Sequence, residues 1–280
     1  MNPDGAPRHQ LHACTRIGAQ LSPPFVIFIP GLDGATSFFD GVVPLVTPHA
    51  TVAIFFLPLR PAAMPETAYT LDYLANELAT TVDNVLTEAA SQRAAVHLVG
   101  ESFGGVVAQV YARRRCHRAV ASLVLLSSLA KTNLPPNIAW KADNLLPILK
   151  GVGWLLPGIA QAIFARLHVD DVCEPTEQQY VKDLFVQEAS RADFRSVMSR
   201  IGLVRHLDIV EEAKAITLPT LIVHGTDDHF TKESSVELHG LIQGSTLRSL
   251  PGGHLPHITS PGLFADMIVA HILSAHAVSL

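Results

Sequence analysis

The sequence predicts an α/β fold, with a doubly wound, mostly parallel sheet and an inserted helical cap, on three observations. Short apolar runs rich in β-branched and aromatic residues alternate along the chain with helical patterns, which is typical of a sheet covered by helices on both faces. The runs are continuous, as expected for strands that are buried on both faces. One helical interval, residues 129–218, interrupts the alternation and is far too long for an ordinary connection.

Six segments are predicted to be the strands of the sheet, the first five of them apolar runs and the last a predicted strand of mixed composition. In chain order they are Phe25–Pro30, Val52–Leu57, Ala95–Val99, Leu123–Leu126, Thr220–His224 and Thr246–Leu250. Helical patterns lie between them at residues 70–89 and 104–115. In the first of these, apolar residues recur every three or four positions and indicate one buried stripe. The stripe consists of Leu71, Leu74, Leu78, Val82, Val85 and Leu86.

The long interval is predicted to be a helical cap inserted above the sheet. Its helical segments are Ile138–Leu149, Leu155–Leu167, Glu177–Glu188 and Arg191–Arg205. The predicted division is a core of residues 1–130 and 214–280, with residues 131–213 as the cap. Its most apolar side chains are Leu145, Leu146, Ile148, Leu149, Trp154, Leu155, Leu156, Ile159, Ile163 and Phe164. This excess indicates either a pocket for an apolar group or contact with a lipid surface.

The composition excludes several classes of protein. Hydrophobic residues make up 48% of the 280 residues and charged residues 16%, and the mean hydropathy is +0.29. Disordered chains have the opposite balance. With 25 acidic and 20 basic side chains, the formal net charge is −5. Nucleic-acid-binding proteins usually carry a basic excess, so no nucleic-acid partner is expected.

Neither a membrane span nor a metal site is expected. The most apolar stretch, residues 144–164, is interrupted by two prolines and a lysine, and residues 1–24 contain no apolar segment of a signal peptide. The expectation is therefore a cytoplasmic protein. The cysteines, Cys14, Cys116 and Cys173, follow no zinc or disulfide spacing, and no metal or organic cofactor is expected.

The motif Gly-Glu-Ser-Phe-Gly at residues 100–104 is the strongest functional signal in the chain. It follows the apolar run Ala95–Val99 and precedes a helical pattern. This strand–turn–helix context is what a nucleophile elbow of the form G-x-S-x-G requires. The turn is so tight that neighbouring positions admit only glycine, and the serine hydroxyl projects above the carboxyl edge of the sheet. Ser102 is therefore the candidate nucleophile.

A serine nucleophile needs a general base, and His254 is the favoured candidate. In this kind of fold the order along the chain is serine, acid, histidine. His254 follows a glycine pair in a loop after the predicted strand Thr246–Leu250, where its side chain would overhang the sheet edge beside Ser102. His257 lies three residues further on and stays open as the alternative.

The acid that orients the histidine is expected after the preceding strand. Thr220–His224 is followed by Gly225 and then by Asp227 and Asp228. Either carboxylate could hold the imidazole and stabilise its protonated form. Asp228 is favoured, and Asp227 stays open as the alternative.

A tetrahedral oxyanion also needs two N–H donors that are already in place. One is expected from Phe103, the residue after the nucleophile. The second is expected from the loop Pro30–Gly34 directly after the first apolar run, where the glycines let the backbone approach a substrate closely. Within this loop, the backbone N–H of Leu32 is the candidate oxyanion donor.

With these motifs in order, the chain resembles the α/β-hydrolase superfamily over about residues 25–275. The motifs are PGLDG at 30–34, GESFGG at 100–105, HGTDD at 224–228 and PGGH at 251–254. The resemblance implies an eight-stranded sheet, a mobile helical cap and a triad of Ser102, Asp228 and His254. PGLDG together with GESFGG resembles serine esterase, lipase and acyltransferase branches that act on long-chain or isoprenoid esters.

A second, fainter likeness is to the maspardin family, carried by VHLVGESFGGVVAQVYA at residues 96–112 and the region that follows. In that family the acid and histidine positions are degraded, whereas this chain keeps Asp228 and His254, which indicates an active enzyme. The short segment before the first inner strand also departs from the superfamily. It predicts that the outer pair of strands is reduced to one strand near Leu11–Gly18.

The expected function is hydrolysis of a small-molecule carboxylic ester through an acyl-enzyme, with an apolar acyl or alcohol group. Acyl transfer and thioester hydrolysis on the same triad are alternatives, because a fold does not fix its chemistry. A non-catalytic ligand receptor or adaptor is a further alternative. Transient contact with a membrane surface is expected through residues 144–164, and the oligomeric state is left open.

Overall fold

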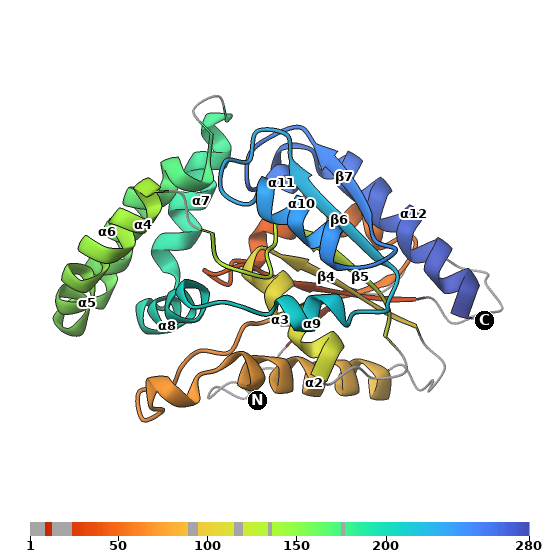
Figure 1. Cartoon of the computed structure of the whole chain (residues 1–280), viewed down its shortest axis with the longest axis horizontal. Helices are drawn as coiled ribbons and strands as arrows, with labels where there is room; N and C mark the ends of the chain where they lie inside the picture. Colours follow the sequence, from red (N-terminus) through yellow and green to blue (C-terminus); the bar gives the residue numbers. More distant parts are fainter. Residues whose placement is uncertain are drawn as a thin grey trace.

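The computed structural model describes residues 9–12, 24–88, 95–114, 120–133, 136–174 and 177–279. In these residues a central sheet carries helices on both faces, and a group of helices lies beyond one end of the sheet (Figure 1). The predicted fold class, a mostly parallel doubly wound α/β fold with a helical insertion between two strands, is confirmed.

The sheet has seven strands in the described residues, in the spatial order β1-β3-β2-β4-β5-β6-β7. The strands are β1 (His9–His12), β2 (Phe25–Ile29), β3 (Thr51–Phe55), β4 (Val96–Glu101), β5 (Val120–Leu126), β6 (Thr220–Gly225) and β7 (Thr246–Leu250). Strands β2 to β7 are parallel to one another, and β1 pairs with β3 in the antiparallel direction. The carboxyl ends of the parallel strands therefore meet at one edge of the sheet.

The continuous apolar runs are explained by two separate hydrophobic cores, one on each face. In β2, Ile27 and Ile29 belong to the first core, whereas Val26 and Phe28 belong to the second. Successive side chains of a strand point to opposite faces, so a strand covered on both sides is apolar at every position.

Helices from four regions of the chain cover the first face, and two helices cover the second. The first core contains residues from α2 (Leu71–Glu88), α3 (Phe103–Arg114), α9 (Val210–Lys214) and α10 (Lys232–Leu241). The second contains residues from α1 (Val43–Val46) and α12 (Pro261–Ser279). The apolar stripe of α2 is buried as predicted at four positions, Leu74, Leu78, Val82 and Val85.

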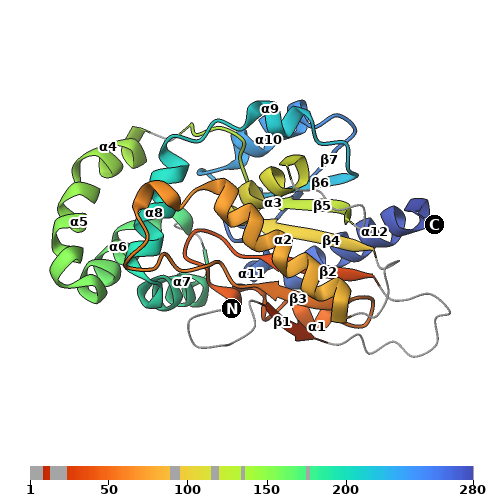
Figure 2. The ribbon, with the colours of Figure 1, turned by 90° about the horizontal axis from the view of Figure 1, so that it is seen from below.

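The inserted helices are α4 (Pro136–Asn144), α5 (Leu146–Leu155), α6 (Pro157–Val172), α7 (Gln179–Arg191) and α8 (Phe194–Arg205), all between β5 and β6. They lie beyond the end of the sheet in both views (Figures 1 and 2). They have apolar cores of their own, one of which joins α4, α5, α6 and α8. The division into a core and a cap at residues 131 and 213 stays a prediction.

The predicted helix Ile138–Leu149 is wrong in one respect, because the structure has two helices there. Helix α4 ends at Asn144, and α5 begins at Leu146 with Pro147 in its first turn. Proline lacks a backbone N–H and is tolerated in the first turn, where that N–H would have no partner in the helix. Pro157 begins α6 for the same reason, so this helix starts later than the predicted Leu155.

The outer edge of the sheet also differs from what the resemblance implies. Seven strands are present in the described residues instead of eight, because a single antiparallel strand, β1, lies outside β3. A single outer strand agrees with the prediction, but it occupies His9–His12, and residues 13–18 of the predicted segment lie outside the described residues. Across the described part of the chain, no helix is long and apolar enough to cross a membrane.

Candidate active site

Ser102 lies between β4 and α3 with a backbone φ of 50°, a left-handed conformation that is rare for any residue other than glycine. The glycines around it are required by close approach. A Cβ on Gly100 would lie 2.6 Å from the Cα of Gly105, and a Cβ on Gly104 would lie 2.2 Å from the carbonyl oxygen of Ile29. The backbone therefore has the strained, tightly packed turn that the motif predicts.

Three side chains that are far apart in the sequence form one hydrogen-bonded line. The Nε2 atom of His254 lies 3.0 Å from the Oγ atom of Ser102, and its Nδ1 atom lies 3.3 Å from Oδ2 of Asp228. The three come from the loops after β4, β6 and β7, whose carboxyl ends lie at the same edge of the sheet. All three are buried. This arrangement can deprotonate the hydroxyl and hold the resulting imidazolium.

Thr231 is a fourth member of this cluster that the sequence reasoning missed. Its hydroxyl donates a hydrogen bond of 2.6 Å to Oδ2 of Asp228 and lies 3.2 Å from Nδ1 of His254. The backbone N–H groups of Phe230 and Thr231 each donate to Oδ1 of Asp228 at 2.9 Å. Both oxygens of the Asp228 carboxylate thus accept hydrogen bonds, which fix the orientation of the carboxylate toward the imidazole of His254.

The buried pair of Asp228 and His254 shifts the pKa of each group. Burial by itself raises the pKa of Asp228, but the charge of His254 and the hydrogen bonds from His254 and Thr231 outweigh it and hold the pKa well below its usual range. Burial lowers the pKa of His254, but the carboxylate of Asp228 outweighs it, so the net pKa of His254 is raised. The imidazole is therefore a stronger base than a free histidine.

The two alternatives lie elsewhere. Asp227 is exposed and accepts a hydrogen bond from the hydroxyl of Thr226 at 3.1 Å. His257 is fully buried between Phe39 and Phe264, with ring centroids 5.5 and 5.9 Å away. Neither of its ring nitrogens has a hydrogen-bond partner among the described residues. The structure thus brings Asp228 and His254 to Ser102, and it does not bring Asp227 or His257 there.

His257 is predicted to make the fold sensitive to acid. Burial and the nearby His254 lower the pKa of His257 to about 3, so the folded protein keeps it neutral while the unfolded chain takes up a proton below pH 6.5. Stability is therefore lost as pH falls. Relative to His257→Leu, the wild-type chain should lose about 2 kcal/mol more unfolding free energy between pH 7 and pH 5, measured by urea unfolding. Parallel losses in both proteins would contradict this assignment.

The two candidate oxyanion donors face the same cavity as Ser102. Phe103 is the first residue of α3, so its N–H has no acceptor within the helix. Leu32 is the second residue of a turn closed by a 3.0 Å hydrogen bond from the N–H of Gly34 to the carbonyl oxygen of Gly31. The N–H of Leu32 is not used by this turn. Both residues therefore stay candidates for the donors to an oxygen beside Ser102.

Glu101, directly before Ser102, is a buried acid that the motif alone did not single out. Its Oε2 atom accepts a hydrogen bond of 2.6 Å from the N–H of Gly31, in the same turn as Leu32. Burial and then the charge of Asp33 raise the pKa of Glu101 to about 7. Glu101 therefore joins the nucleophile elbow to the turn that carries Leu32, the second candidate oxyanion donor.

Arg200, on α8, is a buried cation that holds the same turn from the other side. Its Nη1 donates to the carbonyl oxygen of Leu32 at 2.9 Å, and its Nε donates to the hydroxyl of Tyr69 at 3.1 Å. Its Nη2 donates to the carbonyl oxygens of Leu57 and Pro58. The sequence offered no signal for it, because its partners lie more than a hundred residues away. Arg200 ties the inserted helices to the loops after β2 and β3.

Replacing Arg200 with methionine is expected to lower the unfolding free energy by roughly 2–4 kcal/mol, because buried carbonyl groups would lose their donor. Urea unfolding at neutral pH measures this loss. Arg195→Met is the matched control on the same helix, since Arg195 is exposed and its side chain donates a hydrogen bond to the carbonyl oxygen of Ala62. Equal stability of the two variants would contradict the role of Arg200 as an anchor.

Two hollows adjoin this region. The one beside Ser102, which we call the Ser102 cavity, has a volume of about 150 Å³. Apart from Ser102, His254 and the turn Gly31–Gly34, its walls are mostly apolar and come largely from the inserted helices, with Ile138, Ala142, Leu146, Phe164, Phe185 and Val204 among them. Such walls suit an apolar group of a ligand.

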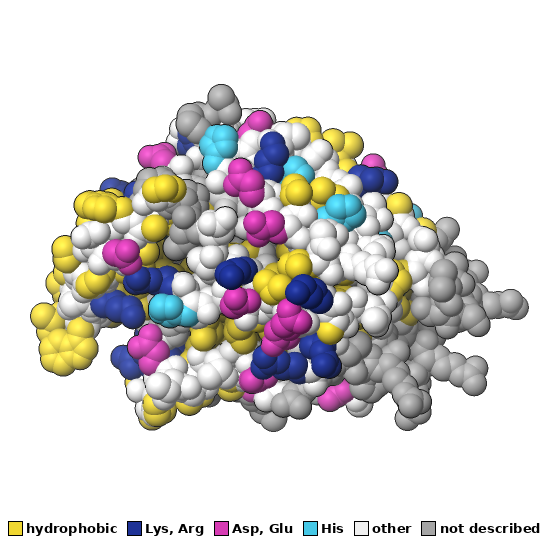
Figure 3. All heavy atoms as spheres, viewed as in Figure 1, with side chains coloured by type: hydrophobic (Ala, Val, Ile, Leu, Met, Phe, Trp, Pro, Cys, Tyr) yellow, Lys and Arg dark blue, Asp and Glu magenta, His cyan; other side chains and the backbone are white. Residues whose placement is uncertain are grey.

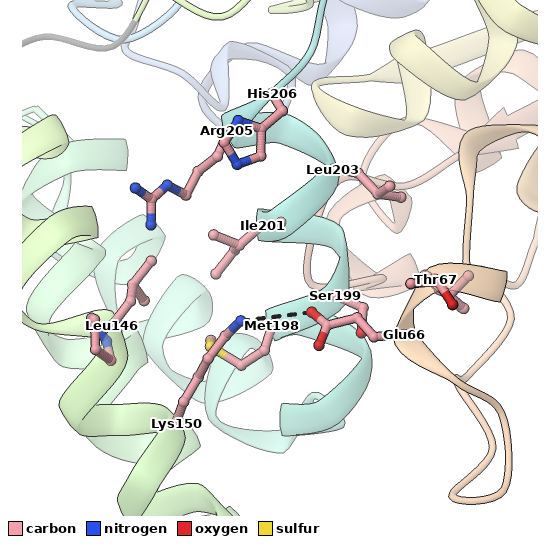
Figure 4. Close-up of a pocket in the computed structure, with 13 residues that line it drawn as sticks. Glu66, Thr67, Leu146, Lys150, Met198, Ser199, Ile201, Leu203, Arg205 and His206 are labelled. Atoms are coloured by element: carbon pink, nitrogen blue, oxygen red, sulfur yellow. Dashed lines mark ion pairs between the residues drawn. The ribbon is translucent and has the colours of Figure 1, made fainter.

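The second hollow is a larger groove of about 430 Å³ between α5, α8 and the short helix η2 (Glu66–Ala68) (Figure 4). An ion pair of 3.6 Å between Lys150 and Glu66 crosses it. It contains neither Ser102 nor His254, so its size does not make it the reaction site. Leu146 and Ile201 line both hollows, and the groove therefore adjoins the Ser102 cavity.

No group of His, Cys, Asp and Glu side chains that could hold a metal ion occurs in the part of the chain that the structure describes. Cys173 is buried, and burial raises the pKa of its thiol to about 12, so the thiol stays protonated.

Comparison with known families gives a match over most of the chain. A family model, Hydrolase_4, described as serine aminopeptidase S33, matches residues 67–251. The putative carbamate hydrolase RutD of Variovorax paradoxus is 30% identical over 85% of this chain and 88% of its own length. The pimeloyl-[acyl-carrier protein] methyl ester esterase of Aeromonas hydrophila is 27% identical over 85% and 90%, respectively.

One curated relative is much longer than this chain. The polyketide synthase ThaQ of Burkholderia thailandensis is 28% identical over 89% of this chain, but the matched region is only 12% of that protein. The similarity therefore concerns a single region of the synthase.

Solved structures share the fold. An esterase from Thermogutta terrifontis has a TM-score of 0.77 at 18% identity and covers 96% of this chain and 93% of its own. The enol-lactonase of Burkholderia xenovorans has a TM-score of 0.75 at 18% identity, with 95% of both chains covered. At this identity the likeness extends to the fold alone. None of the matches described here tests the likeness to maspardin, which stays a prediction.

Proposed function

Because the chain belongs to the α/β-hydrolase superfamily, in the family described as serine aminopeptidase S33, we propose that it is a serine hydrolase that cleaves carboxylic esters through an acyl-enzyme. The observation that carries the proposal is the hydrogen-bonded line from Ser102 through His254 to Asp228, at the wall of an apolar cavity. The relative from Aeromonas hydrophila, named for an acyl ester, supports an ester substrate.

In the first half of the reaction, the Oγ atom of Ser102 attacks the ester carbonyl carbon while Nε2 of His254 takes the hydroxyl proton. The carboxylate of Asp228 stabilises the imidazolium. The N–H groups of Leu32 and Phe103 donate to the oxyanion of the tetrahedral intermediate. The intermediate then collapses, the bond to the alcohol oxygen breaks, and His254 gives its proton to the departing alcohol.

The second half restores the enzyme. A water molecule attacks the acyl carbon of the ester formed on Ser102, and Nε2 of His254 takes one of its protons. The same two amides stabilise the second oxyanion. When this intermediate collapses, the proton returns to Oγ of Ser102 and the carboxylic acid leaves. Each step needs only the residues described above, the ester and water.

The inserted helices supply most of the walls of the Ser102 cavity, which supports an apolar acyl or alcohol group in the substrate. We further propose that residues 131–213 act as the cap of the site. Arg200 of α8 donates to the carbonyl oxygen of Leu32, so a movement of the cap would reach the turn Gly31–Gly34 directly.

A panel of p-nitrophenyl esters, from acetate to palmitate, tests the substrate class and the depth of the cavity together. We expect turnover, with a preference for an acyl chain longer than acetate. A fluorophosphonate probe should label the wild-type chain and not Ser102→Ala. A thioester that carries the best acyl group compares thioester hydrolysis with ester hydrolysis. An alcohol added to the ester assay compares transfer of the acyl group to that alcohol with hydrolysis by water. Absence of both labelling and turnover would support a receptor or adaptor instead and overturn the proposal.

A further inference from the structure

The end of the insertion that is formed by α5, α6 and the turn between them carries an exposed apolar surface. We call this surface, made of the exposed side chains between Ile148 and Ile163, the apolar tip. Trp154 is 85% exposed, Leu155 70% and Ile148 64%. The other members are Leu156, Ile159 and Ile163. Isolated exposed apolar residues are ordinary, but six within sixteen positions on one helical hairpin are a concentration that needs an explanation.

Packing of the hairpin does not explain the apolar tip. Each helix already buries a different set of side chains, Leu146 and Leu149 from α5 and Ala160 and Phe164 from α6, in the core shared with α8. The exposed set contributes nothing to that core. A Cβ on Gly151 or Gly158 would meet no atom within 4 Å, so the space around the tip is open.

The exposed part of the hairpin carries two cations. Lys150 and Arg166 are the charged residues between Asn144 and Val169, and the acids Asp143, Asp170 and Asp171 adjoin this stretch, with Asp143 paired to Arg205 and Asp171 to Lys141. Arg166 is exposed on α6. Lys150 lies 3.6 Å from Glu66 of η2, with both side chains about half exposed, and an exposed pair of this kind is weak enough to be exchanged for another anion.

The apolar tip projects from the molecule. Helices α5 and α6 lie at the extreme left of the chain in Figures 1 and 2, far from the sheet. In the space-filling view, hydrophobic side chains gather along this edge, with both basic and acidic side chains beside them (Figure 3). The surface is thus a convex protrusion, which fits into a soft layer better than into a preformed protein groove.

We propose that the apolar tip is a docking surface for an anionic lipid layer. Trp154 and its apolar neighbours enter the boundary between headgroups and acyl chains, where an amphipathic ring is favoured, while Lys150 and Arg166 contact anionic headgroups. A convex apolar end, an exposed tryptophan and two cations on the same helical hairpin are together features that such a layer selects. The known fold and the proposed chemistry do not require this surface.

The position of the tip also suggests what docking would do. The buried sides of the same two helices carry Leu146 and Phe164, which line the Ser102 cavity. An apolar ester dissolved in the lipid layer would therefore be separated from the Ser102 cavity only by helices α5 and α6. This consequence rests on the proposed function, whereas binding to the lipid layer does not.

Vesicle flotation with the full chain tests the proposal. The probes are vesicles of phosphatidylcholine alone and of phosphatidylcholine with about 30% phosphatidylglycerol. We expect the wild-type chain to float with the anionic vesicles and to bind the neutral ones more weakly. In Trp140→Phe, which keeps Trp154 as its single tryptophan, the fluorescence should shift to shorter wavelength with the anionic vesicles only, because the ring leaves water.

Two variants and a matched control locate the binding surface. Trp154→Ser/Leu155→Ser/Ile159→Ser should lower the partition coefficient at least roughly tenfold. Lys150→Gln/Arg166→Gln should remove the preference for anionic vesicles. The control, Leu45→Ser/Val236→Ser/Leu263→Ser, changes side chains that are 45%, 50% and 52% exposed elsewhere, and should bind like the wild-type chain. Circular dichroism and the Tm of each protein establish that it is folded.

The outcomes separate this proposal from its competitors. Absence of flotation with both kinds of vesicle overturns it, as does equal loss of binding in the tip variant and the control. Dimers in sedimentation equilibrium that the tip variant abolishes, without vesicle binding, would assign the surface to a second copy of the chain. Flotation does not depend on turnover, and hydrolysis of a water-soluble ester does not depend on vesicles. The lipid-binding proposal and the proposed function can therefore fail independently of each other.

Discussion

Replacing Ser102 with alanine is expected to lower kcat/KM for an activated ester by roughly 10⁴–10⁶-fold. The hydroxyl is the atom that forms the acyl-enzyme, and no other hydroxyl lies within hydrogen-bond distance of Nε2 of His254 in the described residues. The variant should fold normally, because alanine tolerates the same space and the hydroxyl makes no contact on which the turn depends. Steady-state kinetics with the best ester of the panel measure the loss.

The matched control for this prediction is Ser249→Ala. Ser249 is exposed on β7, so its hydroxyl can be removed without touching the cavity. We expect the control to retain the wild-type rate. Residual activity of Ser102→Ala within tenfold of the wild type, with the protein shown to be folded, would sink the assignment of Ser102 as nucleophile.

Replacing Asp228 with asparagine is expected to lower kcat by roughly 10³–10⁴-fold. The amide would keep the shape of the side chain, but it could no longer stabilise the imidazolium of His254 or fix its tautomer. Asp227→Asn is the matched control in the neighbouring position, since Asp227 is exposed and contacts Thr226 instead. Similar losses in the two variants would contradict the assignment of Asp228.

The pH dependence gives this prediction a second, independent readout. Reaction requires neutral His254, whose pKa in the folded protein is raised by the carboxylate of Asp228. The rate of the wild-type enzyme should therefore fall as pH drops through a value above the ordinary histidine pKa. In Asp228→Asn that cause is gone, so the acid limb should move to lower pH. If the acid limb of the kcat/KM profile lies at the same pH in Asp228→Asn as in the wild-type enzyme, the interaction between Asp228 and His254 would be contradicted.

Most of the sheet could be predicted from the sequence, because its physical cause is local. A strand such as β2 is apolar at every position since Val26 and Phe28 enter one core and Ile27 and Ile29 the other, and this pattern is visible without the fold. The break between α4 and α5 was missed, although Pro147 marked it, because the apolar spacing continued through the break. Periodicity identifies a helix better than it locates the end of one.

The nucleophile elbow could also be recognised in advance. Gly100, Gly104 and Gly105 all lie within three residues of Ser102, so the steric requirement for glycine around the turn is visible in one short motif. The choice between Asp227 and Asp228, or between His254 and His257, could not be settled in this way. Neighbouring residues differ only in the direction of the side chain, and that direction depends on how the loops after β6 and β7 pack.

The sequence by itself determined the fold class, the turn around Ser102 and the order of the candidate residues, because these depend on apolar spacing and on short-range steric limits. Only the tertiary structure decided which aspartate and histidine reach Ser102, and that Arg200, Glu101 and Thr231 support them. Arg200 meets the carbonyl oxygen of Leu32 across 168 positions of the chain. Contacts at such separation leave no local pattern, because they arise only when the folded chain brings distant segments together.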